Sequence, residues 1–595
     1  MRNTAFFSRA GSLLVACTAL LAIMVSASAA ADEDPPGRVA RVNLLDGRGA
    51  MEPAGTQDWL DELVNRPLTG GDKVWIDSGS RAEMHIGSTA LRLGAGTAVQ
   101  IMTIDDRRVR LRVTAGSVNV HVRALDEDER FEIETPAGEI SVLQPGGYRL
   151  DVDDHSARAQ FAVWSGYAEV RGDSGSRTLH SDEAVELIGG DEPALETASA
   201  GAPDSLDLWA EDRDHREDQA RAAHYVSRDV VGYEELDGYG VWDSDPVYGL
   251  VWFPQDLVVG WAPYRFGHWV WIGLWGWTWI DDAPWGFAPC HYGRWVHAGR
   301  GWAWAPGPRE VRRPVFAPAL VAWRGDRYPR REDGDGRAPR VGWVPLGYNE
   351  IYEPPFHASR NYLRAANLSN TRLGHAEVDR FIEARAQPGA QRPERHYANE
   401  SVPGALTTVT RDTFVGAKPV ARNRINVGPD EARQIPFSAS GPGLRPEARS
   451  AGRVIPSDRP TVRPDRSAFD RPVNAAAVAP TVRAPPPAPH QVQREAPRDV
   501  QRNDRRDDRP ITAPVERRVD RVSERSAPPS APVEMRRESP PRYVPPPEYH
   551  AAPHSTAAPS REQRYSPPPS APASGESSSG SSSSHEERHH DRGQR

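Results

Sequence analysis

A tandem repeat rich in tryptophan constrains the fold of this chain more than any other sequence feature. Residues 260–285 are followed by a second copy of the same pattern at 286–307, and partial copies flank the pair at 249–254 and 342–345. Each copy alternates aromatic with other residues and is interrupted by glycine and proline, which is typical of two short strands joined by a turn. The sequence therefore predicts a module of β-hairpin repeats within a Trp-rich domain that covers residues 227–436.

The tryptophans of this module have two interpretations. Fourteen of the chain's 18 tryptophans lie between Trp242 and Trp343. Aromatic residues at regular spacing usually form a core, and each ring buries roughly 150–250 Å². Because residues i and i+2 of a strand share a face, some rings can instead form an exposed stripe that stacks on sugar rings. The residues predicted to bind a ligand in that way are Trp269, Trp271, Trp277, Trp279, Trp295, Trp302, Trp304, Tyr264 and Tyr292.

Other residues of the repeats have structural roles in the core interpretation. Gly267 and Gly293 are expected to form the turns of the hairpins. Arg265 or Arg294 is expected to lie over a ring face, where an exposed cation contributes roughly 0.5–1 kcal/mol. The adjacent carboxylates at 281–282 stand in the link between the copies, where such pairs usually make a turn.

Residues with the potential for chemistry do not form a recognisable catalytic pattern. His268, Cys290, His291 and His297 lie close together, but their spacing does not fit a zinc ribbon or finger. Cys290 and His297 occupy slots that aromatic residues fill in the other copy, so packing explains them. A nucleophile elbow, a zinc-protease motif and a phosphate loop are missing from the sequence. We therefore expect no enzyme, metal or cofactor; the alternative, an unrecognised hydrolase, requires a deep pocket with converging carboxylates.

The region before the repeats alternates apolar and polar side chains with a period of two. Segments such as 109–113 and 118–122 read as strands, and turn residues separate them. The sequence predicts a compact all-β domain over residues 38–190. The fold class expected for the whole chain is therefore mainly β, with few helices.

This all-β region resembles the FecR-like periplasmic domain. The resemblance covers about a quarter of the chain and rests on motifs at 71–74, 79–84, 91–93, 113–118, 131–136 and 164–170. One position departs from the family pattern, because Ile86 stands where an aspartate usually precedes Gly87 and Ser88. The resemblance implies sensing or signalling at the envelope with a partner. The iron-uptake regulators of that family carry a membrane helix before this domain, whereas only a signal peptide precedes it here, so contact with a sigma factor is not implied.

The tryptophan-rich region closely resembles a Trp-rich domain of unknown function that follows FecR-like domains in exported proteobacterial proteins. The matching segments are 225–227, 232–237, 248–252, both repeats and 341–347. This resemblance implies an architecture and no activity.

Two helices are expected outside the strands. Residues 204–226 read as a linker helix, with Asp204 or Ser205 as its N-cap and the charged run 211–218 as a solvated face. A second helix is expected at 375–386. Its apolar face is formed by Val378, Phe381 and Ile382.

The N-terminus reads as an export signal. Residues 1–29 combine a positive start, an apolar stretch at 13–25 and small residues at 27–29. The expected location is therefore the periplasm or the exterior, with a retained N-terminal anchor or a lipoprotein at Cys17 as alternatives. Removal of the signal leaves Cys290 as the one cysteine, so the fold has no intrachain disulfide.

The C-terminal part has the composition of a disordered tail. Residues 437–595 are rich in proline, arginine and serine, and 28 of the chain's 56 prolines fall within 441–595. Such a segment buries too little apolar area to offset its ordering entropy. Residues 32–200 carry 31 acidic and 17 basic side chains, a balance that argues against nucleic acid as a partner.

These features together predict a non-enzymatic envelope protein that acts as a binding or scaffolding module, through aromatic repeats that bind glycan or cell wall. The first alternative is sensing and signal transduction through the FecR-like domain, and the second is an unrecognised hydrolase. The expected partners are an envelope glycan or a periplasmic protein. A transmembrane segment after the signal peptide is not expected.

Overall fold

Strands dominate the part of the chain that the computed structural model describes, so the mainly β prediction is confirmed. The described residues are 34–61, 63–325, 340–386, 396–438, 441–455 and 468–472. All of them belong to one unit, residues 1–486, and the second unit, 487–595, lies outside them. The predicted signal peptide, 1–29, also lies outside the described residues. Within them, no helix has the length and apolar character needed to span a bilayer.

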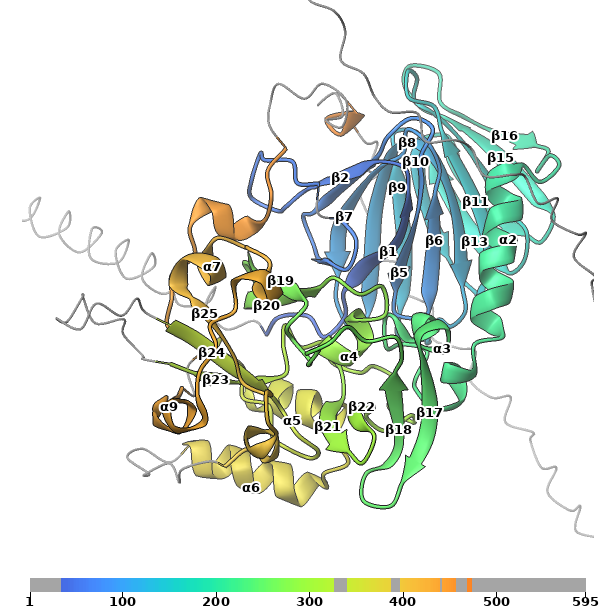
Figure 1. Cartoon of the computed structure of the whole chain (residues 1–595). Helices are drawn as coiled ribbons and strands as arrows, with labels where there is room; N and C mark the ends of the chain where they lie inside the picture. Colours follow the sequence, from blue (N-terminus) through green and yellow to red (C-terminus); the bar gives the residue numbers. More distant parts are fainter. Residues whose placement is uncertain are drawn as a thin grey trace, which may run out of the picture. The chain divides into compact units, whose positions relative to one another are not determined.

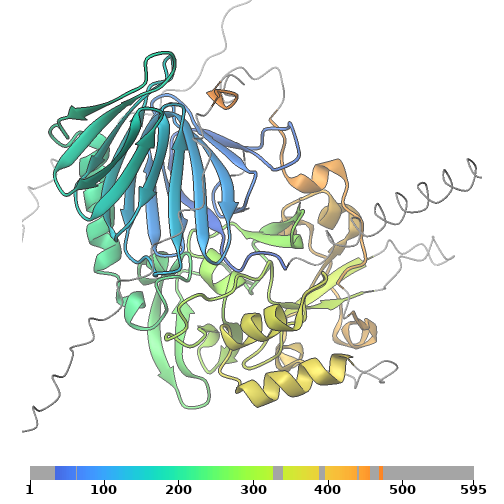
Figure 2. The ribbon, with the colours of Figure 1, turned by 180° about the vertical axis from the view of Figure 1, so that it is seen from behind.

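The first part of the chain folds into two β-sheets that form a sandwich (Figure 1, blue to cyan; Figure 2). One sheet has the order β3-β1-β5-β6-β8-β11-β12-β15-β16, and the other has the order β2-β4-β7-β8-β9-β10-β13-β14. Alternation sends every second side chain inward, where Val, Leu and Ile side chains of both sheets form one core. The strands are β1 (Ala40–Asp46), β2 (Gly49–Glu52), β3 (Pro67–Leu68), β4 (Lys73–Ile76), β5 (Arg81–Ile86), β6 (Thr89–Leu93), β7 (Ala98–Ile104), β8 (Arg108–Val122), β9 (Arg130–Thr135), β10 (Gly138–Val142), β11 (Gly146–Val152), β12 (Arg158–Val163), β13 (Tyr167–Gly172), β14 (Gly175–His180), β15 (Glu183–Ile188) and β16 (Ala194–Ala198).

Strand β8 belongs to both sheets. Its first half pairs with β7 and β9, and its second half pairs with β6 and β11. The strand changes sheet at Gly116, which has a φ of +86° and lies so close to Thr97 that a Cβ would stand 2.4 Å from the Thr97 Oγ1 atom. The sequence predicted two separate strands, 109–113 and 118–122. That prediction was wrong because the small residues between them bend one strand and do not end it.

Helix α2 (Ser205–Asp218) lies on the outer face of the sheet that contains β6 and β11 (Figure 1). Asp204 is its N-cap, as predicted, and the Asp204 carboxylate accepts two backbone N–H groups of the first turn. Asp214 and Glu217 turn toward the sheet and pair with Arg92 of β6 and with Arg123, which directly follows β8. The prediction that 211–218 is a solvated face was therefore wrong at these two positions.

The Trp-rich module consists of small sheets and short helices (Figure 1, green to orange). The first repeat forms the hairpin β19–β20 and the second forms β21–β22, so the two-strand interpretation of each copy is confirmed. One four-stranded sheet has the order β17-β18-β22-β21, and another has the order β25-β24-β23-β26. The strands are β17 (Gly240–Asp245), β18 (Gly249–Pro254), β19 (Gly267–Ile272), β20 (Gly276–Asp281), β21 (Arg294–Ala298), β22 (Gly301–Ala305), β23 (Val321–Arg324), β24 (Arg340–Pro345), β25 (Thr407–Thr410) and β26 (Phe437–Ser438).

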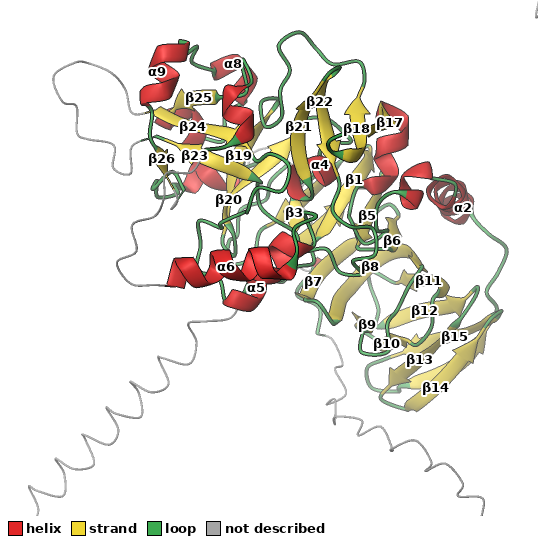
Figure 3. Cartoon of the chain, turned by 90° about the horizontal axis from the view of Figure 1, so that it is seen from below, coloured by secondary structure: helices red, strands yellow, loops and turns green. Residues whose placement is uncertain are grey.

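Short helices complete the module. The predicted helix at 375–386 is α6 (His375–Ala386), with Val378 and Ile382 buried against α5 (Arg360–Leu368) (Figure 3). The predicted linker helix was too long, since α2 ends at Asp218 and a separate 3₁₀ turn follows. The remaining helical segments are η1 (Arg221–His224), η2 (Tyr233–Glu235), α3 (Leu236–Tyr239), α4 (Phe287–His291), η3 (Ala398–Ser401), α7 (Arg411–Val415), α8 (Val420–Asn423), α9 (Pro429–Gln434) and η4 (Ala448–Ala451).

The predicted tail begins later than its composition indicated. Strand β26 pairs with β23, and residues 441–455 and 468–472 contact the folded part of the chain. The boundary at 437 was therefore wrong for these residues. Residues 473–595 lie outside the described part of the chain.

Candidate functional site

Pairs of tryptophans face each other across the hairpins of the module. Trp269 lies opposite Trp279 in β19–β20, and Trp295 lies opposite Trp304 in β21–β22. The flanking partial copies repeat the arrangement, with Trp242 opposite Trp252 and Trp323 opposite Trp343. Such cross-strand aromatic pairs are the contacts that stabilise short hairpins.

A glycine at the start of each hairpin makes room for an indole ring: Gly267 is the first residue of β19, and Gly293 directly precedes β21. A Cβ on Gly267 would stand 2.6 Å from the ring of Trp279, and a Cβ on Gly293 would stand 2.6 Å from Trp304 Nε1. The two glycines therefore serve ring packing, and the prediction that they form the turns was wrong. The turns of the two hairpins lie between β19 and β20 and between β21 and β22, several residues further along the chain.

The structure places most of the predicted ligand-binding rings inside the module. Seven of the nine are at most 3% exposed, and only Trp271 and Trp302 are partly exposed. A second layer, formed by rings such as Trp323, Trp343 and Phe414, covers the stripe of the first repeat. The seven buried residues are Trp269, Trp277, Trp279, Trp295, Trp304, Tyr264 and Tyr292. As a set, the nine residues therefore do not form the exposed stacking surface that the glycan interpretation requires.

The two arginines of the repeats bind oxygen atoms and do not lie over rings. Arg265 donates to the carbonyls of Gly260 and Leu406, and Arg294 donates to the carbonyls of Glu350 and Gly293. Burial lowers the pKa of each guanidinium to about 10. The expected cation–π contact was therefore wrong at both positions, because bent backbone segments supply carbonyl groups that need a donor.

The side chains that suggested a metal site have separate structural partners. The Cys290 thiol donates to the Asp281 carboxylate over 3.6 Å, and the indole of Trp279 donates to the same carboxylate over 2.9 Å. Burial raises the pKa of Asp281 to about 6 and raises the pKa of the Cys290 thiol well above its usual value. His291 instead bonds to the carbonyl of Ala317 over 2.7 Å. These contacts give Cys290 and Asp281 a role in packing the end of β20.

A cluster of buried charges lies where the sandwich meets α2 and the module, and we call it the interface cluster. At its centre, the Glu83 carboxylate of β5 accepts from Arg92 of β6 over 3.0 Å and from Arg213 of α2 over 2.7 Å. Burial opposes the charge of Glu83, but Arg213, His85 and Arg92 hold its pKa well below its usual range. The members of the cluster are Arg41, Glu83, His85, Arg92, Arg123, Arg213, Asp214, Glu217 and Glu234.

Two side chains of the sandwich extend from this cluster into the module. Arg41 of β1 pairs with Glu234 over 3.3 Å and donates to the carbonyl of Pro284 over 2.6 Å. Asn65 donates to the carbonyl oxygens of Asp281 and Ala283 over 3.0 and 2.8 Å. These bonds join the sandwich to the link between the two repeats.

His85 is the imidazole of the interface cluster. Burial lowers the pKa of its imidazole, but Glu234, Glu217 and Glu83 outweigh that effect and raise the pKa to about 9. The nearest carboxylate oxygens lie 3.2 Å away on Glu83 and 3.4 Å away on Glu234. His85 is therefore a buried cation at neutral pH.

Stability should fall on the alkaline side because of His85. The folded pKa lies above the unfolded value of 6.5, so the stabilisation is complete below pH 6.5 and is lost as the pH rises through about 9. We expect the free energy of unfolding to fall by roughly 2–3 kcal/mol across this window. Chemical denaturation of the wild type and of His85→Gln between pH 6.5 and 9.5 measures the difference.

The His85→Gln variant should lose this alkaline slope, whereas His155→Gln, at an exposed site, should keep it. Titration of lysines interferes little with this measurement, because Lys73 and Lys418 are the only lysines of the chain. An identical slope in His85→Gln and the wild type would show that the imidazole does not carry the effect.

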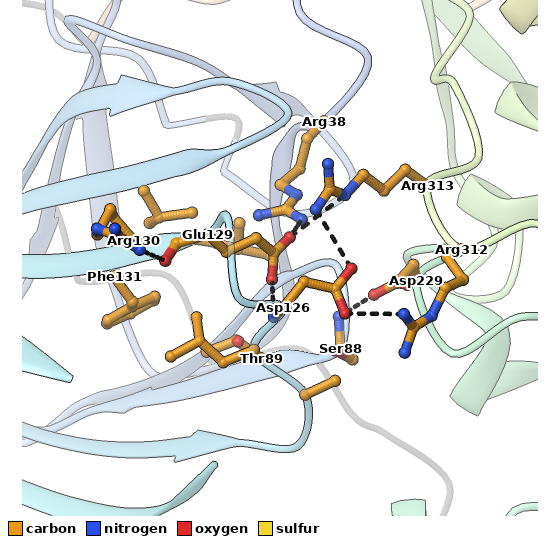
Figure 4. A pocket seen from close by; sticks show the side chains of 14 residues that line it. Arg38, Ser88, Thr89, Asp126, Glu129, Arg130, Phe131, Asp229, Arg312 and Arg313 are labelled. Atoms are coloured by element: carbon orange, nitrogen blue, oxygen red, sulfur yellow. Dashed lines mark hydrogen bonds and ion pairs between the residues drawn. The ribbon is translucent and has the colours of Figure 1, made fainter. Parts of the chain in front are cut away.

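A pocket of about 40 Å³ lies beside the interface cluster, between the sandwich and the module (Figure 4). Its acidic side chains are paired with arginines. Asp126 lies 3.1 Å from Arg312 and 3.2 Å from Arg313, and Glu129 pairs with Arg38 and Arg313. One water molecule needs about 10–15 Å³ of such a cavity, so the pocket has room for a few water molecules.

Comparison with known proteins gives two family matches. The model described as "FecR protein" matches residues 72–169, and the model described as "Family of unknown function (DUF6600)" matches residues 233–350. No curated protein matches the chain.

Two crystal structures of a proposed anti-sigma factor from Parabacteroides distasonis ATCC 8503 are similar to this chain at 17% identity, with TM-scores of 0.20 and 0.19. The match covers 22% of this chain and 60% of the solved chains, so this chain spans less than two thirds of their length. These matches confirm the two resemblances seen in the sequence, because the match to the FecR model is followed along the chain by the match to the DUF6600 model.

Proposed function

We propose that this chain is an exported, non-enzymatic envelope protein whose FecR-like sandwich binds a protein partner in a signalling role. In this proposal the Trp-rich module is a structural support that holds the sandwich through the interface cluster. The FecR match supports the signalling role, and the sequence of residues 1–29 supports export.

The observation that carries the proposal is a pair of free sheet edges. Among the described strands, β14 pairs only with β13, and β16 pairs only with β15. The side chains of β14 are mostly exposed, and those of β16 are exposed or half-buried. Unpaired backbone groups on an edge strand are a template for a strand of another protein. The edges therefore offer a place for a partner to bind by strand addition.

The glycan interpretation has less support than protein binding. Seven of the nine rings that were predicted to bind glycan are buried. The two partly exposed rings each pack against another ring of the same hairpin. Trp271 lies 5.4 Å from Trp277, and Trp302 lies 5.4 Å from His297. The hydrolase interpretation needs converging free carboxylates, whereas Asp126 and Glu129 in the pocket are paired with arginines.

Site-specific photocrosslinking in cells of the source organism tests the proposal. A crosslinking residue placed at Thr178 of β14 or Glu196 of β16 is expected to form an adduct with one defined envelope protein. The same residue at Glu383, on the exposed face of α6, is the matched control and should give no such adduct. Adducts with glycan at the edges, or equal adducts at all three positions, would contradict the proposal.

A further inference from the structure

A row of small and aromatic side chains crosses the outer face of the sandwich. Ala50 of β2 lies opposite Trp75 of β4, Trp75 lies opposite Ala98 of β7, and Ala98 lies opposite Ala115 of β8. The three alanines are buried even though they face away from the main core of the sandwich. Ile455 and Phe469 pack on this surface, which we call the groove and which is formed by Ala50, Trp59, Trp75, Ala98 and Ala115.

A remote segment of the chain fills this groove. The ring of Phe469 is 6% exposed and lies 5.5 Å from the ring of Trp59. The ammonium group of Lys73 lies 5.5 Å from the centre of the Phe469 ring. Ile455 packs into the same cluster and donates its backbone N–H to the carbonyl of Trp59 over 2.8 Å.

Polar contacts fix the direction of the segment. The Thr114 hydroxyl, at the bend of β8, donates to the carbonyl of Ala468. The Arg471 guanidinium donates to the carbonyl of Thr114 over 2.9 Å and to the carbonyl of Ser156 over 2.8 Å. The groove therefore recognises an aromatic ring and, two residues later, an arginine.

We propose that this groove is a peptide-binding site whose ligand class is a short segment with an aromatic residue followed at i+2 by arginine, and that residues 468–472 are its ligand within the chain. The segment acts as a latch that holds the start of the Pro/Arg-rich region against the FecR-like sandwich. Opening of the latch exposes Trp59 and the alanine row to another peptide of the same chemistry.

Sequence and packing distinguish the latch from an ordinary element of the fold. Phe469 is the only Phe, Trp or Tyr between Phe437 and Tyr543. Its cluster of buried residues is separate from the core of the sandwich and from the core of the module. A short connection within one chain holds the segment at an effective concentration of roughly 1 mM, so a dissociation constant about tenfold lower is enough to keep the groove occupied. The latch is therefore closed most of the time and remains exchangeable.

Binding of a peptide to the full-length chain tests the latch. The probe is a fluorescein-labelled peptide with the sequence of residues 464–475, and the readout is fluorescence polarisation. The Phe469→Ala chain is expected to bind the probe about tenfold more tightly than the wild type, because the groove is no longer occupied from within. Arg509→Ala, which changes another Asp-Arg-Pro sequence at 508–510, is the matched control and should bind like the wild type.

Specificity and folding have their own controls. A probe with alanine at the position of Phe469 or Arg471 should bind at least tenfold more weakly to the Phe469→Ala chain. The near-ultraviolet circular dichroism of the Trp-rich module should be unchanged, since Phe469 lies outside its core. Where this signal is lost, Arg471→Ala replaces Phe469→Ala and is expected to increase probe binding in the same direction.

Two outcomes would overturn the proposal. One is equal probe binding by the wild type and the latch variants, and the other is undiminished binding of the probe that lacks the aromatic ring. The test does not depend on the sheet edges β14 and β16, so its failure leaves the proposed partner binding untouched.

Discussion

Replacement of Trp269 by alanine is expected to lower the free energy of unfolding of the Trp-rich module by about 3–5 kcal/mol. The Trp269 ring is 1% exposed and contacts four other rings. The ring centres lie 4.7 Å from Trp323, 5.1 Å from Trp343 and 5.4 Å from both Trp279 and Phe414. The deletion removes the ring on which these contacts converge, and the cavity left behind adds to the lost transfer free energy. Guanidinium denaturation followed by near-ultraviolet circular dichroism measures the change.

Trp271 is the matched control because it lies two residues further along the same strand and is only partly buried. Trp271→Ala should cost about 1–2 kcal/mol, in proportion to the smaller area that its ring buries. If both variants lose the same stability, the rings that cover Trp269 do not contribute to the stability of the module. If Trp269→Ala keeps the wild-type stability, Trp269 lies outside the core.

The second large effect is expected at the interface cluster. Glu83→Ala should destabilise the protein by about 3–5 kcal/mol, because it leaves buried cations without their counter-charge. Arg92 and His85 are almost fully buried, and each lies within 3.2 Å of the Glu83 carboxylate. Arg213 of α2 loses its partner as well. Limited proteolysis should therefore show earlier cleavage near α2, in step with the loss of stability.

Asp46→Ala provides the control for the loss of a carboxylate on the same sheet. Asp46 pairs with Arg81, and both side chains are well exposed. An exposed pair of this kind contributes roughly 0–1 kcal/mol, so the variant should unfold close to the wild-type midpoint. Similar losses in Glu83→Ala and Asp46→Ala would contradict the view that buried charges hold the sandwich to its neighbours.

Local patterns predicted the elements of this fold better than their junctions. Alternation along 109–113 and 118–122 correctly indicated β-structure, but it predicted two separate strands. The backbone of Gly116 instead redirects a single strand into the second sheet. Composition likewise predicted a tail from residue 437, because one phenylalanine within a Pro/Arg-rich stretch has little weight in an average. The partner of Phe469 is Trp59, about 400 residues earlier, and no local pattern contains that contact.

The candidate site was predicted only in part, for a related reason. The spacing of the tryptophans shows which rings share a face of a hairpin. It does not show whether that face is covered, because the covering rings Trp343 and Phe414 come from later strands and helices. The interface cluster was missed because it joins charges that are far apart in the sequence, such as Glu83 and Arg213. Their burial depends on α2, whose charges resembled those of a solvated helix.

The passage of β8 through both sheets has a mechanical consequence. The two sheets cannot separate while each keeps its hydrogen bonds. Strand β8 is hydrogen-bonded in both sheets, and its backbone runs from one sheet into the other. Tension applied by a partner at the edge strands is therefore carried along the backbone of β8 from one sheet to the other. The sandwich should yield to such a force as one unit, without sliding of one sheet over the other.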